Sequence, residues 1–374
     1  MLDQRPLLGE LGSASASLLE DMYRPEDALF PHSTRQDARG LEHTFEHPHT
    51  IRYTINTLLG LQRAARSGCQ DRFLQSTEGM VDRFVELHLG ETIDPASVGL
   101  LLLLLAEGGR HESLLGELVG RIGATVQQAP ADSLTIQELS WMLWGASAAA
   151  RVDATGATSL ADRLFATMDE RFVDPSSLLA RHSLSRYRSR IVSFGGIVYF
   201  LRATYEYAAL TGERRPRRLF ESGVEAMLGI QGPRGEWPWM ISVRTGIPLD
   251  FYPVFGVHQD SMAMLFLLPA LDDGLLDVED AIARSLAWSL GKNELHVPMY
   301  GAGRFFAYRS IRRDQRLFRQ RRYARSLARA FADRSGSLTG GKGLMVNREC
   351  RSYHLGWILF AWAGRPDQPR LEAP

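Results

Sequence analysis

The sequence predicts an all-α protein built as a closed ring of about six helical hairpins, an (α/α)6 toroid. Helical periodicity runs through most of the 374 residues, and no Asn-Gly or Asp-Gly hairpin joins alternating segments. Two kinds of helix alternate along the chain. One kind is apolar nearly all round and must be buried on every side, whereas the other is amphipathic and covers a core with one face. The alternative is an open stack of helix pairs, which would not need so many wholly apolar helices.

About twelve helices are expected after an N-terminal one. The helices expected in the inner ring are 50–66, 95–107, 134–151, 193–211, 258–272 and 353–363. The helices expected to cover them are 71–88, 111–128, 157–171, 215–230, 278–290 and 312–333. The last two helices occur in reversed order, so helix 353–363 would stand beside helix 50–66 and close the ring.

The chain is expected to form one toroid domain over residues 43–364. Residues 1–42 would be an N-terminal extension that packs on the barrel, and residues 365–374 would be a C-terminal tail. The long connections, at 172–192, 231–257 and 334–352, lead from outer to inner helices. Long ordered loops on a rigid scaffold concentrate binding and catalytic residues. The site rim is therefore expected at the N-terminal ends of the inner helices, where free N–H groups carry partial positive charge.

Composition excludes several classes of protein. Lys+Arg and Asp+Glu both number 43, so no excess positive charge is present to hold nucleic acid or an anionic membrane. The N-terminus carries acidic residues where a signal peptide is basic and then apolar, and the longest apolar run, 98–106, is about half of a membrane span. The two cysteines, Cys69 and Cys350, make no disulfide scaffold. We expect a cytoplasmic protein that binds neither nucleic acid nor membrane and uses no cofactor; a homodimer is compatible with the sequence.

The segment 231–260 is the richest in candidate site residues, and Gly, Pro and aromatic residues interrupt any helix in it. Its candidates are Glu236, Trp237, Trp239, Arg244, Asp250, Tyr252, His258, Gln259 and Asp260. Carboxylates and a histidine supply general acid/base capacity, and flat aromatic faces can hold sugar rings or isoprenoid chains. The alternative is a packed loop whose tryptophans plug the end of the barrel, with Arg244 paired to Asp250.

Two other segments enter inner helices with polar side chains. Glu349, Arg351, Tyr353 and His354 stand at the start of the last apolar helix, and Glu46, His47, His49 and Tyr53 stand at the start of the first. Polar residues that enter the ring interior are unfavourable unless they are hydrogen-bonded or functional, and arginine can hold a carboxylate or phosphate with two bonds. The alternatives are a structural pair between Glu349 and Arg351 or Arg348, and a surface loop with solvated histidines.

No metal site and no phosphate loop follow from the motifs. His47 and His49 form a His-x-His pair, but no spacing brings Cys350 or His258 to it, so no metal is expected. The glycine-rich run 338–344 lacks the spacing of a P-loop and follows no strand signal.

Eleven arginines crowd residues 304–334 against two acids, Asp314 and Asp333. A patch for a polyanion is one interpretation. The solvated face of an outer helix is the favoured one, because the chain as a whole is neutral. Arg304 and Tyr308 precede the helix and are candidates for the site rim.

The run from Gln231 to Trp237 reads QGPRGEW and resembles the QW motif of the α/α-toroid terpene cyclases and prenyltransferases. In that family the motif ties helices together, which implies a structural role for Gln231 and Trp237. The DxDD motif of the cyclases has no counterpart here. The number of helix pairs is also similar to that of six-hairpin glycosidases, polysaccharide lyases and sugar epimerases. That resemblance implies carboxylates, His, Tyr, Arg and stacking Trp at the same rim.

The sequence predicts a carbohydrate-active enzyme that works by general acid/base catalysis on a glycosidic bond or a sugar carbon, with a small-molecule or oligosaccharide substrate. One of Glu236, Asp260 and Glu349 would be the proton donor and another the base or nucleophile. His258, Tyr353 and His354 would assist proton transfer, Trp237, Trp239 and Tyr252 would stack on the sugar, and Arg244 and Arg351 would hold an anionic substituent. Carboxylates too far apart to share a substrate would favour an epimerase or lyase that uses Tyr and His.

Two other functions remain open on the sequence. The first is an isoprenoid cyclase or isomerase in the same toroid, with Asp260 or Glu349 as the protonating acid. The second is a non-catalytic binding scaffold that uses the arginine-rich face for a partner.

Overall fold

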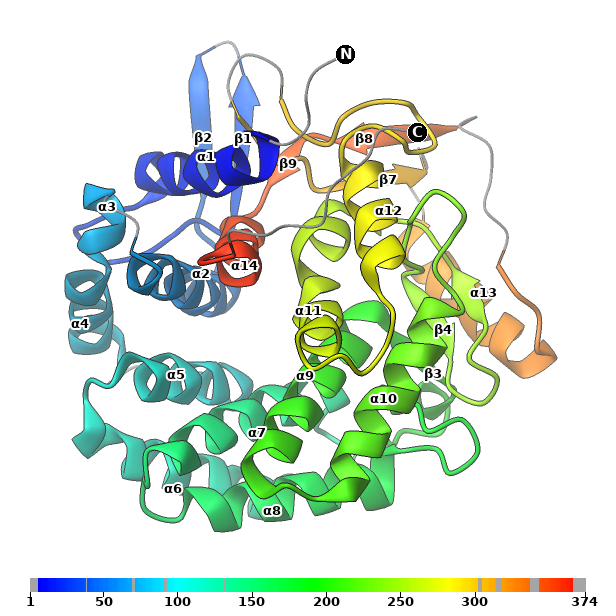
Figure 1. The fold of residues 1–374 in the computed structure, drawn as a ribbon, viewed down its shortest axis with the longest axis horizontal. Helices are drawn as coiled ribbons and strands as arrows, with labels where there is room; N and C mark the ends of the chain where they lie inside the picture. The colour runs from blue at the N-terminus through cyan, green and yellow to red at the C-terminus, as the bar shows by residue number, and fades with distance from the viewer. Residues whose placement is uncertain are drawn as a thin grey trace.

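The computed structural model describes residues 6–37, 39–68, 71–90, 93–130, 132–301, 305–313, 318–336 and 343–365, and it is a closed ring of helices (Figure 1). The inner ring consists of α2 (His49–Arg66), α5 (Pro95–Gly108), α7 (Ile136–Arg151), α9 (Phe194–Thr211), α11 (Met264–Asp272) and α14 (Ser352–Trp362). A π-helical turn, His258–Met262, leads into α11. The last inner helix, α14, packs along the first, α2, and closes the ring as the sequence predicts.

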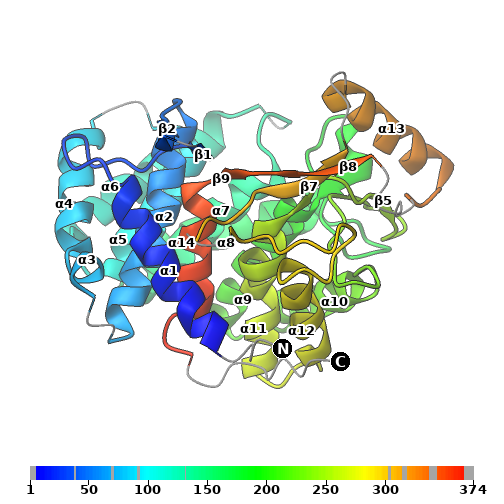
Figure 2. The same cartoon turned by 90° about the horizontal axis from the view of Figure 1, so that it is seen from above.

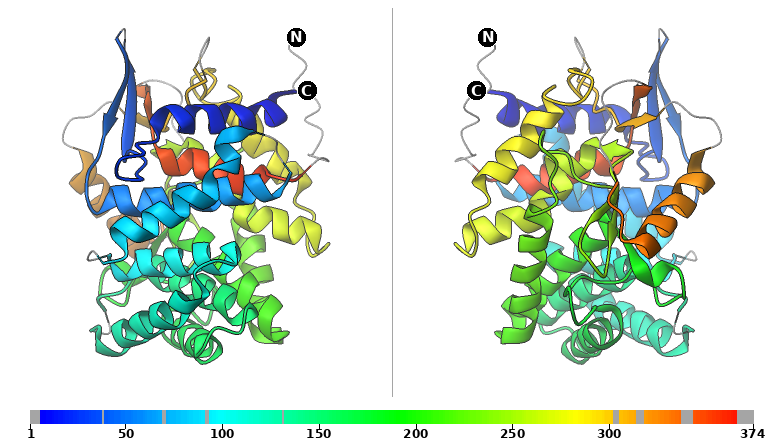
Figure 3. Two further views of the ribbon diagram at one scale, coloured as in Figure 1. Left: turned by 90° about the vertical axis from the view of Figure 1, so that its left-hand side faces the viewer. Right: turned by 90° about the vertical axis from the view of Figure 1, so that its right-hand side faces the viewer.

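Amphipathic helices cover the inner ring. They are α3 (Arg72–Gln75) with α4 (Thr77–His88), α6 (Glu112–Gln128), α8 (Ala157–Thr167), α10 (Arg214–Leu228) and α12 (Glu279–Ser289). The remaining outer place, beside α14, belongs to α1 (Pro6–Met22), which Figures 2 and 3 show alongside α14. None of the helices in the described part of the chain combines the length and apolar character that crossing a bilayer requires.

The prediction that 312–333 is an outer helix of the ring is wrong. Residues Ser310–Arg313 form strand β7, and the helix that follows, α13 (Phe318–Ala332), lies on the rim. Its apolar residues Leu327 and Ala330 pack on a small cluster that includes Leu249. An amphipathic pattern shows that one face is covered but not which element covers it. The long N-terminal helix α1 therefore takes the place that the sequence assigned to α13.

The protein is mainly helical, as the sequence predicts, but the long connections form three small antiparallel sheets among the described residues. Their orders are β2–β1–β9, β3–β4–β5 and β6–β7–β8. The strands are β1 (Ser33–Asp37), β2 (Gly40–Thr44), β3 (Ile191–Ser193), β4 (Met240–Ser242), β5 (Pro248–Asp250), β6 (Val254–Phe255), β7 (Ser310–Arg313), β8 (Leu344–Asn347) and β9 (Glu349–Cys350). Strands of two to five residues are too short to show a period in sequence.

The inner helices approach one another backbone to backbone. A Cβ on Gly60 of α2 would overlap the carbonyl oxygen of Gly356 on α14. A Cβ on Gly99 of α5 would lie 2.8 Å from the Cα of Met142 on α7. Glycine is required at these contacts because real Cβ atoms do not come so close to backbone. The ring is consequently tight along these seams.

The N-terminal ends of the inner helices meet at the rim that carries the sheets. Asp94 caps α5 by accepting a hydrogen bond from Ser97 N at 3.1 Å, and Thr135 forms a capping box with Glu138 at the start of α7. Ser193 caps α9 by accepting from Gly196 N at 3.2 Å. Side chains in the first turns of these helices therefore surround the mouth of the ring.

Candidate functional site

A cavity of about 270 Å³ opens at this mouth, on the predicted rim. It is lined by His49, Arg52, Tyr53, Asn56, Gln137, Trp141, Ser193, Gly195, Tyr199, Trp239, His258, Met262 and Tyr353. The lining comes from α2, α7, α9, α14, the π-helical turn before α11 and the long connection that holds Trp239. Because α2 and α14 both contribute, the site depends on closure of the ring.

His258 is a buried histidine of this lining. Its ring packs between Phe194 and Phe255, with centroids 4.5 and 4.9 Å away. Burial, with a smaller effect from the neighbouring His354, lowers the pKa of His258 to about 3. The imidazole is therefore neutral near pH 7, and its Nδ1 has no hydrogen-bond partner among the described residues. A bound substrate could supply that partner.

Two tyrosines face each other across the seam of the ring. Tyr53 of α2 and Tyr353 of α14 have ring centroids 4.4 Å apart. Burial raises the pKa of Tyr353, and the neighbouring Tyr53 raises it further, so the phenol stays protonated. His32 stacks on Tyr53 with a centroid distance of 5.3 Å and extends this aromatic group toward the rim. The cavity is thus lined by phenolic proton donors as well as by the histidine of the π-helical turn.

Arg52 is the cation of the lining, and hydrogen bonds to the start of α5 hold its side chain in place. Its Nη2 donates to Asp94 at 2.8 Å and its Nε donates to Ser97 at 3.2 Å. The guanidinium carbon lies 5.1 Å from the centroid of the Trp141 ring. Trp141 in turn packs edge-on against Tyr199 at 5.1 Å. A held guanidinium and broad aromatic walls suit a polar ring-shaped substrate that develops negative charge.

Five of the residues predicted from sequence line this cavity: His49, Tyr53, Trp239, His258 and Tyr353. Two others, Asp260 and His354, form a buried pair outside the lining. The carboxylate of Asp260 lies 2.8 Å from Nε2 of His354 and accepts a hydrogen bond from Tyr300 at 2.9 Å. Asp260 and His354 can therefore act on a substrate only through neighbouring groups.

Glu349 and Arg351 also lie outside the lining. The Glu349 carboxylate pairs with Arg351 at 2.8 Å, as the structural alternative predicts, and with Arg309 at 2.9 Å. Burial alone would raise the pKa of Glu349, but the two arginines outweigh it and the pKa is lowered. Glu349 is therefore held as an anion and has no proton to donate near pH 7. Arg351 also bonds the carbonyl oxygen of His32 at 3.1 Å.

The QW-like segment is tied to α12. Gln231 donates to the carbonyl oxygen of Ala281 at 2.9 Å, and the indole of Trp237 donates to Ser285 at 2.8 Å. The Glu236 carboxylate accepts from the backbone N–H of Arg234 at 2.8 Å, inside its own loop. Neither Glu236 nor Trp237 lines the cavity, so both contribute to the wall of the ring.

The remaining candidates of segment 231–260 are engaged elsewhere. Arg244 pairs with Asp333, and Asp250 pairs with Arg325 at 3.2 Å, so the predicted pair between Arg244 and Asp250 is wrong. Tyr252 donates to Glu294 at 2.8 Å, and the amide of Gln259 donates to the Phe255 carbonyl at 3.3 Å. None of these candidates belongs to the lining among the described residues.

Glu46 and His47 are exposed on the rim. The Glu46 carboxylate lies 3.4 Å from Nδ1 of His32, and His47 precedes a cis peptide bond to Pro48. Of the other rim candidates, Tyr308 packs against Phe306, while Arg304 lies outside the described residues. No three His, Cys, Asp or Glu side chains of the described chain are grouped so as to hold a metal ion.

Sequence reasoning missed Arg52, Asn56, Gln137 and Trp141. A signal was available for three of them, because Arg52, Asn56 and Gln137 are polar residues in the first halves of inner helices. A polar side chain in such a place must be hydrogen-bonded or functional. The long loops supply little of the lining, and most of it comes from the helices that those loops enter.

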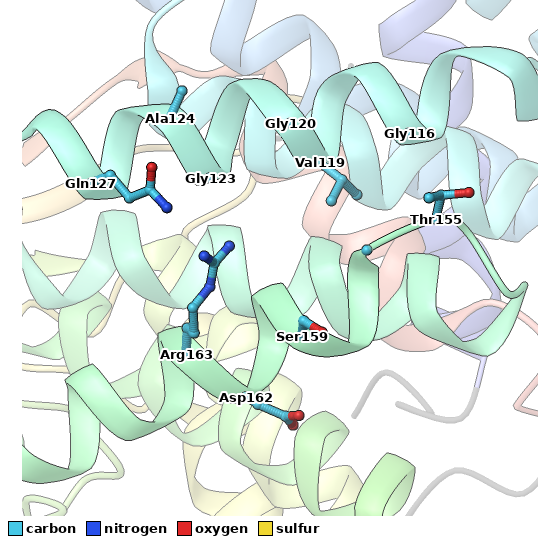
Figure 4. A pocket seen from close by; sticks show the side chains of 11 residues that line it. Gly116, Val119, Gly120, Gly123, Ala124, Gln127, Thr155, Ser159, Asp162 and Arg163 are labelled. Carbon is cyan, nitrogen blue, oxygen red and sulfur yellow. The ribbon is translucent and has the colours of Figure 1, made fainter.

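A larger hollow lies outside the ring, between α6 and α8 (Figure 4). It measures about 600 Å³ and is lined mainly by small residues, with Gln127 and Arg163 at one end. Figure 4 shows side chains from both helices bordering an open groove. It lacks the enclosed set of aromatic and ionisable groups that the cavity at the mouth has.

No protein-family model matches this chain, and no curated protein matches it in sequence. Solved structures do match in fold. Cellobiose 2-epimerase from Bacillus thermoamylovorans B4167 has a TM-score of 0.66 at 10% identity over 96% of this chain and 100% of that one. An unsaturated glucuronyl hydrolase specific for heparin has a TM-score of 0.63 at 12% identity over 95% of both chains.

An inactive variant of an α-1,6-mannanase from Salegentibacter sp. HEL1_6, in complex with a mannose tetramer, has a TM-score of 0.58 at 12% identity. That match covers 96% of this chain and 98% of the mannanase. At such low sequence identity, these similarities establish a shared fold and not a shared function. The chain has the (α/α)6-toroid fold that these glycosidases and epimerases share.

Proposed function

We propose that this protein is a carbohydrate-active enzyme that moves a proton at the carbon next to the carbonyl of a reducing sugar, as an epimerase does. The observation that carries the proposal is the lining of the mouth cavity. It combines a neutral buried histidine, His258, with phenols at Tyr53 and Tyr353 and a fixed cation, Arg52. The sugars named for the structural neighbours support the substrate class.

The lining does not favour hydrolysis. Glycoside hydrolysis uses two carboxyl groups that flank one bond, about 5–10 Å apart. Among the described lining residues there is no Asp or Glu. The nearby acids Asp260 and Glu349 are occupied by His354 and by two arginines. Histidine and tyrosine remain as the groups that can exchange protons with a substrate.

The proposed reaction uses each of these groups once. His258 takes the proton from the sugar carbon, and the electron pair moves to the carbonyl oxygen to give an enediolate beside Arg52. Tyr353 then donates its phenolic proton to the other face of the carbon, and the resulting phenolate regains a proton from the imidazolium through water. Because burial keeps His258 neutral, it is ready to accept a proton, and the developing enediolate favours the imidazolium that forms.

The other two functions that the sequence leaves open have less support. Cyclisation of an isoprenoid needs a strong acid in an apolar aromatic cavity, whereas Arg52, Asn56, Gln137 and Ser193 make this lining polar. A binding scaffold would have no use for a neutral histidine with an unpartnered Nδ1 at the mouth of the ring. The homodimer and the cytoplasmic location stay predictions, which gel filtration and cell fractionation would test.

The test is proton exchange in deuterated water, followed by NMR. Aldoses, cellobiose and mannobiose are incubated with the protein, and we expect deuterium at the carbon next to the carbonyl together with the epimeric sugar. His258→Gln should slow exchange by about 10²–10⁴-fold, the usual contribution of an acid/base group. His296→Asn is the matched control, since His296 is exposed and in left-handed backbone that asparagine adopts readily.

Two results would overturn the proposal. One is release of sugars from a glycoside with no solvent deuterium on carbon. The other is exchange that proceeds at the same rate in His258→Gln. Prenyl diphosphates serve as the negative substrates, and their turnover would instead support the isoprenoid alternative.

A further inference from the structure

A second cavity lies at the opposite end of the ring, where the inner helices end. It measures about 310 Å³. Its lining includes Arg63 in the last turn of α2, Arg202 and Glu206 of α9, Asp272 at the end of α11 and Phe360 of α14. Arg365, just after α14, completes the charged part of the lining.

A layer of aromatic side chains separates the two cavities. Trp357 of α14 lies at the centre of this layer, with ring centroids 5.9 Å from Tyr199 and 6.1 Å from Trp144. Tyr199 borders the mouth cavity, and Phe360, 5.3 Å from Trp357, borders the second one. A ligand in one cavity therefore does not contact a ligand in the other.

The acids of the second cavity already have arginine partners. Glu206 pairs with Arg202 and, at 2.6 Å, with Arg151. Asp272 pairs with Arg365. Arg63 has no such partner, because its guanidinium donates no hydrogen bond and forms no ion pair with any described residue.

Arg63 and Arg202 both contact the Phe360 ring. Their guanidinium carbons lie 4.4 and 5.8 Å from the centroid of the Phe360 ring. Burial lowers the pKa of Arg63, and the like charge of Arg202 lowers it further, while Glu107 and Glu206 only partly offset this. The Nε of Arg202 is buried with no hydrogen-bond partner among the described residues. Two neighbouring cations thus border a cavity with unused donors.

We propose that this cavity binds a small anion bearing a carboxylate or phosphate group, held between the guanidinium groups of Arg63 and Arg202. Arginine presents several donors in a planar fork that matches the oxygens of either group. The carbonyl ends of the surrounding helices disfavour an anion at this end of the ring. Binding must therefore rest on the arginines, which makes it sensitive to their removal.

The test measures binding of inorganic phosphate and of citrate at constant ionic strength, by calorimetry and by the thermal unfolding midpoint. We expect saturable one-to-one binding of at least one of them, with a rise in Tm that saturates at the same concentration. Phosphate alone would identify a phosphate ligand, and citrate alone a carboxylate ligand. Arg63→Gln should weaken binding at least tenfold.

Arg63→Gln also has a distinguishing effect without anion. Since it removes a guanidinium that forms no hydrogen bond and repels Arg202, its Tm in anion-free buffer should equal or exceed that of the wild type. Arg217→Gln, an exposed arginine of α10 paired with Glu221, is the matched control and should leave binding unchanged. Arg52→Gln should also leave it unchanged, which places the anion outside the mouth cavity.

The proposal fails if neither anion binds saturably, or if Arg63→Gln binds it as tightly as the wild type. It also fails if Arg63→Gln melts lower than the wild type in anion-free buffer, because Arg63 would then be a structural residue. These outcomes do not depend on the sugar chemistry proposed for the mouth cavity.

Discussion

Tyr53 near the start of α2 and Tyr353 at the start of α14 pack with their ring centroids 4.4 Å apart. The first and last helices of the inner ring thus meet at the candidate site. Residues far apart in the sequence become neighbours only when α14 seats beside α2. The chemistry proposed for the mouth cavity therefore depends on closure of the ring.

The two tyrosines are expected to differ in their contribution to catalysis. Tyr353→Phe removes the buried phenol that would donate the proton, and we expect kcat for deuterium exchange to fall by about 10²-fold or more. Tyr53→Phe keeps the ring that packs on Tyr353 and should lower kcat less than tenfold. The measurement is kcat and KM for the best sugar substrate of each variant.

Both substitutions keep the aromatic packing, so the unfolding midpoint should move little. Equal losses of kcat in the two variants would remove the assignment of Tyr353 as the donor. A loss confined to KM would give the tyrosines a role in binding only.

Because several histidines are buried, lowering the pH should destabilise the fold already at pH values where the carboxylates are still ionised. Burial holds the pKa of His258 at about 3, against 6.5 in an unfolded chain. Between these values the unfolded chain binds a proton that the folded chain does not, so the free energy of unfolding falls as pH falls. His258 alone should contribute a loss of about 1.4 kcal/mol per pH unit below 6.5. Burial lowers the pKa of His32 and of His182 to about 4, which adds to this slope.

Urea unfolding between pH 7 and pH 5 measures the effect. The slope of the unfolding free energy against pH reports how many protons are taken up on unfolding. In His258→Gln this number should fall by close to one, whatever the substitution does to stability at pH 7. His296→Asn, on an exposed histidine, should leave the slope as it is. A wild-type stability that rises on acidification in this range would contradict the expectation.

The inner ring was predictable because most of its helices are apolar nearly all round, and a helix without a polar face must be buried. That α1 and not α13 covers α14 was not predictable. Both helices are amphipathic, and an amphipathic pattern does not show which element the apolar face covers. Within the site, Tyr53, Trp239, His258 and Tyr353 could be proposed because they stand where loops enter inner helices.

Glu236 and Trp237 show why the sequence could not distinguish the candidates that line the cavity from those that do not. They share a segment with Trp239 and His258, but the hydrogen bonds of the loop turn them toward α12. The composition of a loop records which groups are present. The direction of each side chain is set by backbone turns that short, irregular segments do not reveal.

Trp237 should matter for stability and not for chemistry. Trp237→Phe removes the indole N–H that donates to Ser285 and leaves a small void where the side chain is fully buried. We expect the free energy of unfolding to fall by about 1–3 kcal/mol. KM for the sugar should stay the same, because Trp237 does not line the cavity. A rise in KM of more than threefold would restore Trp237 as a stacking residue.

The close approach of α2 and α14 can be tested with two alanine substitutions. Gly356→Ala places a methyl group 2.6 Å from the Cα of Thr57, where only the backbones of both helices could move aside. We expect a loss of at least ~2 kcal/mol of unfolding free energy, since overpacking against rigid backbone is strongly unfavourable. Proton exchange should fall as well, because separating α2 from α14 separates Tyr53 from Tyr353.

Gly116→Ala is the matched control, since Gly116 lies in the second turn of α6 and a methyl group there meets nothing within 4 Å. It should raise the free energy of unfolding by about 0.5–1 kcal/mol, because alanine favours helix over the unfolded chain. A glycine-to-alanine substitution would then lower the free energy of unfolding at the contact between α2 and α14 and raise it on the outer helix α6. If both variants gained stability, the helices would have room between them, and closure of the ring would not hold the two tyrosines in contact.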